Sequence, residues 1–202
     1  MKNFWDERYK EKAYVYGKEP NQYFAEKLRE LEPGSILLPA EGEGRNAVFA
    51  ARQGWEVSAF DSSSEGRKKA FLLAEEEEVQ IDYQVTDHKG YIPTKDLDVI
   101  SFIYAHFPPT ERKALFQGLT KNLRKNGRVI FEGFAKKHLE YQQKNPKVGG
   151  PKEERMLFSE VELREAFRDL DFLEFYEGEV NLSEGEFHKG TGWVIRFVVQ
   201  KK

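Results

Sequence analysis

The feature that most constrains the fold is a regular alternation of short apolar runs with longer amphipathic segments. The apolar runs have the length and composition of β-strands, whereas the segments between most of them have helical periodicity. The predicted strands are 35–39, 56–60, 79–85, 97–104, 127–134, 171–180 and 192–200, and the predicted helices are 45–54, 62–78, 109–123 and 158–170.

This order predicts an α/β protein whose sheet is mostly parallel and covered by helices on both faces. No helix separates the last two runs, so we expect them to pair as a hairpin and to add an antiparallel edge strand. The 202 residues suffice for one such domain, and no linker divides them. We therefore predict a single domain, 1–202, with a Rossmann-like, doubly wound, seven-stranded sheet in a three-layer α/β/α arrangement.

Composition excludes several classes of protein. The net charge of −3 gives no overall attraction to nucleic acid or to an anionic membrane, and no apolar run is long enough to span a bilayer. The absence of cysteine excludes thiolate chemistry, and the four histidines lack the i, i+4 spacing of a helical metal site. With no apolar leader at the start, we expect a cytoplasmic protein with a small-molecule partner, no nucleic acid, no membrane and no metal.

Two segments do not fit the alternation of strands and helices. They are the N-terminal 1–30 and the Lys-, Gly- and Pro-rich 136–158. Segments of this length in a compact domain are usually functional. We expect the first to act as a cap and the second as a lid over the carboxyl ends of the strands, where α/β proteins bind ligands.

A tight glycine turn lies between the first strand and its helix. Gly42 and Gly44 permit unusual backbone angles and close approach of a ligand, and the helix behind them presents free N–H groups. Asp61 ends the second strand, where a carboxylate can accept both hydroxyl protons of a ribose. The pair indicates a nucleoside site, although a tight turn without a ligand is the simpler alternative.

The turn also fits the dinucleotide fingerprint G-x-G-x-x-A, which leaves an NAD-dependent oxidoreductase open. Glu41 and Glu43 flank the turn and would repel a pyrophosphate. They would attract a ligand that carries an ammonium and a sulfonium group. The charge pattern therefore favours S-adenosylmethionine over NAD.

The stretch LLPAEGEGRNAVFAARQGWEVSAFDSSSEGRKKA resembles the first motif of class I S-adenosylmethionine-dependent methyltransferases. The N-terminal WDERY and YVYGKEPN and the later GGPK narrow the resemblance to small bacterial enzymes similar to tellurite-resistance and thiopurine methyltransferases. The resemblance covers nearly the whole chain. It implies S-adenosylmethionine as cofactor and S-adenosylhomocysteine as product. The cofactor-binding residues that it implies are Glu41, Gly42, Gly44, Asn46, Asp61, Ser62, Asp87 and Tyr104.

The turn departs from the family pattern LDLGCGEGR at two places. Leu38 replaces an aspartate, and Ala40 replaces the first glycine. Glu41 lies in the turn and is the candidate to replace the missing acid near the methionine end. The departures also leave open a protein that binds the cofactor without catalysis.

Further candidates follow the third and fourth strands. By resemblance, Asp87 accepts from the adenine amine, and Tyr104 lies where donor and acceptor meet. His106 is a candidate general base because its ordinary pKa suits proton transfer near neutral pH, although a histidine that caps the strand end is as good an interpretation. Candidate substrate or lid residues are Tyr14, Tyr16, Asn21 and Gly150, with ordinary packing as the alternative for the aromatic rings.

The resulting hypothesis is in-line methyl transfer to a small nucleophile such as a thiol or a chalcogen oxyanion. An ionised acceptor needs no base, so the lack of a catalytic triad does not count against an enzyme. The sequence leaves the acceptor, the use of a base, and the choice between monomer and dimer open.

Overall fold

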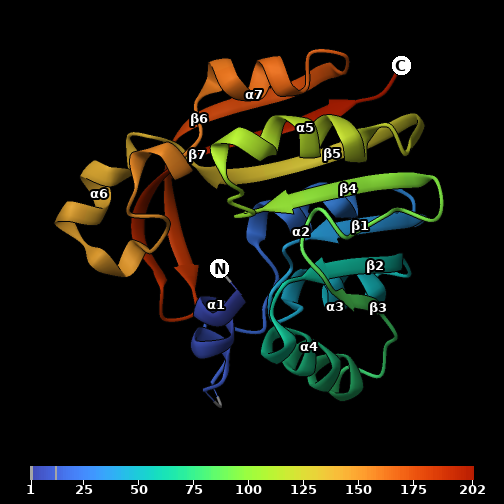
Figure 1. Ribbon diagram of the computed structural model, residues 1–202, viewed down its shortest axis with the longest axis horizontal. Helices are drawn as coiled ribbons and strands as arrows, with labels where there is room; N and C mark the ends of the chain where they lie inside the picture. The colour runs from blue at the N-terminus through green and yellow to red at the C-terminus, as the bar shows by residue number, and fades with distance from the viewer. Residues whose placement is uncertain (1, 12) are drawn as a thin grey trace.

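The computed structural model describes residues 2–11 and 13–202, and its centre is a seven-stranded sheet (Figure 1). The strand order is β3-β2-β1-β4-β5-β7-β6. Strands β1 to β5 pair in parallel, whereas β7 is antiparallel to both β5 and β6. The strands are β1 (Ser35–Pro39), β2 (Glu56–Asp61), β3 (Asp82–Val85), β4 (Leu97–Ile103), β5 (Leu123–Phe134), β6 (Asp171–Glu184) and β7 (His188–Gln200). The predicted Rossmann-like fold is confirmed.

Helices cover both faces of this sheet. The parallel strands carry apolar side chains on both faces, so each face is buried under helices. Side chains from α5 and α7 form one core with the aromatic rings of Phe102, Phe131 and Phe197. Side chains from α2 and α3 form the other core, against Ile36 and Leu38 of β1. The helices are α1 (Lys2–Tyr9), α2 (Gln22–Arg29), α3 (Arg45–Arg52), α4 (Ser64–Glu76), α5 (Pro109–Thr120), α6 (His138–Lys144) and α7 (Glu160–Ala166), with 3₁₀ turns at Pro146–Val148 and Glu154–Met156.

The hairpin of β6 and β7 is longer than the sequence predicts. The two strands pair continuously up to Glu184 and His188, so they include the polar stretch that was expected to be a loop. The tip of the hairpin meets the N-terminal segment, where the N–H of Glu186 donates to the carbonyl of Val15 (3.1 Å). The hairpin thereby forms one wall at the carboxyl edge of the sheet.

The two segments outside the alternation are partly helical. In the first, α2 packs into the core through Phe24 and Leu28 and therefore belongs to the sheet's cover. Helix α1 instead packs against α4 at the carboxyl end of the sheet. In the second, α6 lies beside the β6–β7 hairpin (Figure 1). Parts of both segments, α1 and 150–156, line the cavity described next.

Candidate active site

A cavity of about 1050 Å³ lies at the carboxyl ends of β1 to β4. This volume is at the upper end of the range for small-molecule sites, which leaves room for a cofactor and a second ligand. Its walls come from the turn after β1, the loops after β2, β3 and β4, α1, the end of the β6–β7 hairpin, and residues 150–156. It is the place where the sequence predicted a site.

The glycine turn is shaped by packing as much as by a ligand. Gly42 and Gly44 have φ of 63° and 88°, which favour glycine. A Cβ on Gly42 would lie 2.6 Å from the hydroxyl of Tyr9, and a Cβ on Gly44 would lie 2.5 Å from the Cβ of Ala70. The described lining of the cavity does not include either glycine. Both glycines allow α1 and α4 to approach the turn.

Glu41 lines the cavity and caps α3. One of its carboxylate oxygens accepts the N–H groups of Asn46 and Ala47, both at 2.8 Å. Burial raises its pKa to about 7, against the effect of these hydrogen bonds. Asn46 lines the cavity beside it, and its side-chain oxygen accepts the N–H of Asn21 (2.9 Å).

Glu43 is not a free negative charge. It forms an ion pair with Lys69 of α4 (2.7 Å) and accepts the N–H of Val15 (2.8 Å), so it ties the N-terminal segment to α4. The expected repulsion of a pyrophosphate by two glutamates is therefore wrong for Glu43. Of the two, only Glu41 lacks an ion-pair partner among the described residues.

Asp61 is buried at the end of β2 and lines the cavity. Its two oxygens accept the N–H groups of Gly42 (3.2 Å) and Ser63 (2.8 Å). Burial raises its pKa to about 6. A carboxylate has about four acceptor positions, so the group retains capacity for two ligand hydroxyls. Ser62 lies next to it in the lining.

Asp87 lies in the cavity wall after β3. One oxygen accepts the N–H groups of Gly90 (2.9 Å) and Lys89 (3.0 Å), which hold its pKa below the ordinary value. The apolar side chains of Phe60, Val85 and Phe107 also line the cavity at the carboxyl edge of the sheet. A flat apolar group with an exocyclic donor would match this combination.

Tyr104 lies at the end of β4 with φ of 52°, a left-handed angle that is strained for a bulky residue. Its ring stacks on Phe134 with centroids 4.6 Å apart, and its hydroxyl donates to Glu132. Glu132, which the sequence did not single out, is fully buried, forms an ion pair with Arg196 and accepts from Asn21 (3.0 Å). This network holds the Tyr104 ring in the cavity wall.

His106 differs from the expected base. Its Nδ1 donates to the carbonyl of Met156 (3.0 Å), and its Nε2 faces the N–H of Phe134 at 3.5 Å. Burial lowers its pKa to about 3. A neutral imidazole with so low a pKa is a poor general base near neutral pH. Its contact with Met156 instead connects the cavity wall to the segment 150–156.

The four candidate substrate or lid residues divide into two pairs. Tyr16 and Gly150 line the cavity. Tyr14 and Asn21 are not in its described lining: the Tyr14 hydroxyl donates to the carbonyl of Lys69 (3.0 Å), and the buried Asn21 caps α2 by accepting the N–H of Phe24 (2.9 Å). Asn21 therefore supports the cavity wall indirectly, through its hydrogen bonds to Glu132 and Asn46.

The β6–β7 hairpin contributes a residue that the sequence did not indicate. His188 lines the cavity, donates from Nδ1 to Glu184 (3.2 Å), and packs against the ring of Tyr16 with centroids 4.7 Å apart. Glu184 also pairs with Arg45 of α3 (2.8 Å). No local motif marks His188, because its neighbours come from distant parts of the chain.

Within the ranges 2–11 and 13–202, no group of three or more Asp, Glu or His side chains is arranged to hold a metal ion. In the same ranges, no helix has the length and apolar character needed to cross a membrane.

Comparison with known proteins agrees with this fold. Residues 36–127 match a family model described as a methyltransferase domain. A search of curated proteins finds no significant match.

Three similar solved structures cover nearly all of the chain. One, reported for conversion of a disulfide bond into a thioacetal group during echinomycin biosynthesis, has 17% identity and a TM-score of 0.76 over 100% of this chain and 92% of that chain. TehB from Haemophilus influenzae has 16% identity and a TM-score of 0.72 over 100% and 67%. The N-methyltransferase NodS from Bradyrhizobium japonicum WM9, in complex with S-adenosyl-L-homocysteine, has 9% identity and a TM-score of 0.72 over 99% and 97%.

The fold is that of class I S-adenosylmethionine-dependent methyltransferases. The match of residues 36–127 to a methyltransferase domain indicates an enzyme that uses S-adenosylmethionine as its cofactor. The residues present fit this cofactor. Glu41, Asp61 and Asp87 line one side of the cavity without an ion-pair partner among the described residues, which suits a ligand with positive charge and several hydrogen-bond donors.

Proposed function

We propose that the enzyme methylates a small nucleophile that is already ionised when it binds. The observation that carries this proposal is the cavity of about 1050 Å³, whose walls include α1, the β6–β7 hairpin and residues 150–156. A macromolecular acceptor would need an open groove. A cavity bounded on these sides suits a small molecule that is surrounded by the protein.

The side chains of the cavity support an acceptor that needs no base. His106 is neutral, with its pKa lowered to about 3 by burial, and the Tyr104 hydroxyl donates a hydrogen bond to Glu132. The histidine is therefore unsuited to remove a proton near neutral pH. A thiolate or an oxyanion arrives without that proton.

The residues have three tasks in this reaction. Asp61 and Asp87 bind the nucleoside of the cofactor, and Glu41 faces its positively charged end. Tyr104, held by Glu132 and Phe134, supports the wall where the two ligands meet. Helix α1 and residues 150–156 exclude water. The cofactor supplies a methyl group on a positively charged sulfur, so alignment of the nucleophile is the main contribution of the protein.

Calorimetric titration of the purified protein with S-adenosylmethionine, S-adenosylhomocysteine and NAD tests this function, with Asp61→Asn as the site variant. We expect the first two ligands to bind and NAD not to bind. Asp169→Asn, which removes a carboxylate that is 83% exposed outside the cavity, is the control and should bind as the wild type does. A screen of thiols and oxyanions for methyl transfer follows.

Three results would contradict the proposal. Binding of NAD alone would favour an oxidoreductase. Binding of S-adenosylmethionine without turnover of any small nucleophile, but with methylation of a protein or nucleic acid, would assign a macromolecular acceptor. Equal binding by wild type and Asp61→Asn would remove Asp61 from the cofactor site.

A further inference from the structure

The charged side chains of the cavity are segregated. The ends of β1, β2 and β3 carry the carboxylates of Glu41, Asp61 and Asp87 without a cationic partner at ion-pair distance among the described residues. On α1 and the loop after α6, by contrast, the lining contains Arg8 and Lys152, which lack a carboxylate partner at that distance within the same described ranges. One side is therefore negative and the other positive.

The other charges on the positive side cancel one another. Arg45 is paired with Glu184, and Arg196 is paired with Glu132. Burial lowers the pKa of His188, so this imidazole is neutral at neutral pH. Arg8 and Lys152 remain as positive charges in the cavity wall, and Arg8 is the one on α1.

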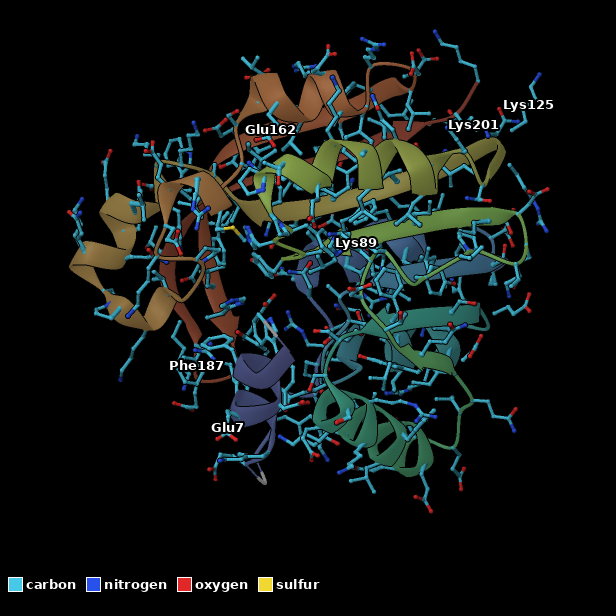
Figure 2. The ribbon with its side chains drawn as sticks, viewed as in Figure 1. Glu7, Lys89, Lys125, Glu162, Phe187 and Lys201 are labelled. Carbon is cyan, nitrogen blue, oxygen red and sulfur yellow. The ribbon has the colours of Figure 1, made fainter. Side chains whose placement is uncertain are left out.

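The surroundings of Arg8 hold its guanidinium in place without neutralising it. The group lies over the rings of Phe187 (4.8 Å), Phe4 (4.9 Å) and Trp5 (5.7 Å), measured from the guanidinium carbon to each ring centre. Figure 2 shows Phe187 at the tip of the hairpin, beside α1. Among the described residues, the Arg8 guanidinium donates a hydrogen bond to the hydroxyl of Tyr16 (3.3 Å). A guanidinium has five N–H donors, so most of them remain for a ligand.

Apart from Arg8, Lys152 and His188, much of this lining is apolar or aromatic. The apolar and aromatic side chains include Tyr16, Phe134, Met156, Phe4 and Trp5. An inorganic oxyanion, which is strongly hydrated, would gain little from these side chains. An organic molecule with an apolar body and one negative group would use both the rings and the cation.

We propose that the methyl acceptor is a small organic anion, and that Arg8 binds its negative group while the aromatic side chains around Arg8 hold its apolar body. This inference rests on the proposed function and narrows its acceptor to one chemical class. It makes α1 part of the acceptor site as well as a cover for the cofactor.

The test uses the full chain saturated with S-adenosylhomocysteine, which fills the cofactor side. Benzoate serves as the organic anion, benzamide as its neutral counterpart, and selenite as an inorganic oxyanion, each titrated by calorimetry. We expect benzoate to bind about tenfold more tightly than benzamide and than selenite, since a hydrogen-bonded charge contributes an effect of this order. Arg8→Gln should abolish the preference for benzoate, and Arg8→Lys should keep part of it.

Arg29→Gln is the matched control, because Arg29 also stacks on an aromatic ring, Phe49 (5.0 Å), but lies on α2 outside the described lining of the cavity. It should bind benzoate as the wild type does. Thermal melting of each variant shows whether it is folded. The comparison of benzoate with benzamide on the wild-type protein tests the anion preference even if Arg8→Gln does not fold.

Several outcomes would overturn the inference. Equal binding of benzoate and benzamide, or no binding of benzoate, would show that the acceptor site does not select a negative group. Tighter binding of selenite than of benzoate would show that the site does not select an organic body. If Arg8→Gln weakens S-adenosylhomocysteine but not 5′-methylthioadenosine, which lacks the amino-acid part, Arg8 binds the carboxylate of the cofactor instead. Failure of S-adenosylhomocysteine to bind the wild type would reject the proposed function itself, whereas failure of benzoate alone rejects only this inference.

Discussion

The two halves of the sheet's carboxyl edge hold their buried carboxylates in opposite ways. At the ends of β1 and β2, Glu41 and Asp61 accept backbone N–H groups, and burial raises their pKa values to about 7 and about 6. At β5 and the hairpin, Glu132 and Glu184 are paired with arginines. Arg45 and His188 hold the pKa of Glu184 at about 2 against the effect of burial, whereas burial raises the pKa of Glu132 even beside Arg196.

This difference separates carboxylates that serve a ligand from those that serve the fold. A buried carboxylate without a cation is costly in the ligand-free protein, and a ligand that brings positive charge or donors relieves that cost. A carboxylate that already has its arginine offers little to a ligand. The contrast predicts opposite effects on stability when the two kinds of carboxylate are neutralised.

The largest effect is expected for Glu132→Gln. The amide keeps the shape of the side chain but leaves Arg196 without its counter-charge, so we expect a loss of about 3 kcal/mol in the free energy of unfolding, measured by urea denaturation. Glu165→Gln removes a carboxylate from an exposed pair with Lys113 and should cost less than about 1 kcal/mol. Similar losses in the two variants would mean that burial of the Glu132 pair does not contribute to the fold.

Asp61→Asn should have the opposite sign. Removal of a buried charge that has no cationic partner among the described residues is expected to stabilise the ligand-free protein at pH 7 by on the order of 2 kcal/mol. The same change should weaken binding of S-adenosylhomocysteine at least about tenfold, because the amide offers fewer acceptors to the ribose. If Asp61→Asn loses stability and keeps its affinity for S-adenosylhomocysteine, Asp61 serves the fold rather than the ligand.

The sequence could predict the first half of the site but not the second. Asp61 and the glycine turn follow consecutive strands, so chain order alone places them together at one edge of the sheet. Arg8 and His188 come from segments far apart, and only the folded chain brings both into the cavity wall. Glu132 lies behind that wall, where it accepts from Tyr104. The charge of Glu43 was misjudged because its partner, Lys69, lies on the next helix. The strands β6 and β7 were predicted too short, because much of β6 is exposed and polar and gives a weak hydrophobic pattern.

The third prediction concerns pH. Since the pKa of Asp61 is raised from 3.8 to about 6 on folding, the folded protein binds more protons between these values, and the stability of the ligand-free protein should fall as pH rises from about 4 to about 6. Affinity for S-adenosylhomocysteine should change in the opposite direction, falling by up to about tenfold per pH unit below about pH 6, because the protonated group loses acceptor capacity. Urea denaturation and binding titrations from pH 4 to 8 check this, and Asp61→Asn should reduce both trends. Part of the fall in stability should remain in the variant, because the pKa of Glu41 is raised to about 7. A wild-type affinity that does not change with pH would mean that Asp61 is ionised throughout or lies outside the cofactor site.

The smallest effect is expected at the turns themselves, where each half of the edge has, among the described residues, one left-handed residue other than glycine. Ala40, after β1, has φ of 54°, and Tyr104, after β4, has φ of 52°. For Ala40 the strain has little compensation, because its side chain is a single methyl group. Ala40→Gly should therefore stabilise the protein by about 0.5 kcal/mol, since relief of about 1–2 kcal/mol of strain exceeds the extra entropy of glycine in the unfolded chain.

Tyr104→Gly should do the reverse although the backbone angle is almost the same. It would relieve similar strain but remove a ring stacked on Phe134 and a hydroxyl bound to Glu132, so stability should fall by several-fold more than Ala40→Gly raises it. Urea denaturation of the two variants compares them directly. If Ala40→Gly also lost stability, the left-handed angle at Ala40 would be supported by contacts of its methyl group, and the departure from the family's glycine would be an adaptation of this turn rather than a tolerated strain.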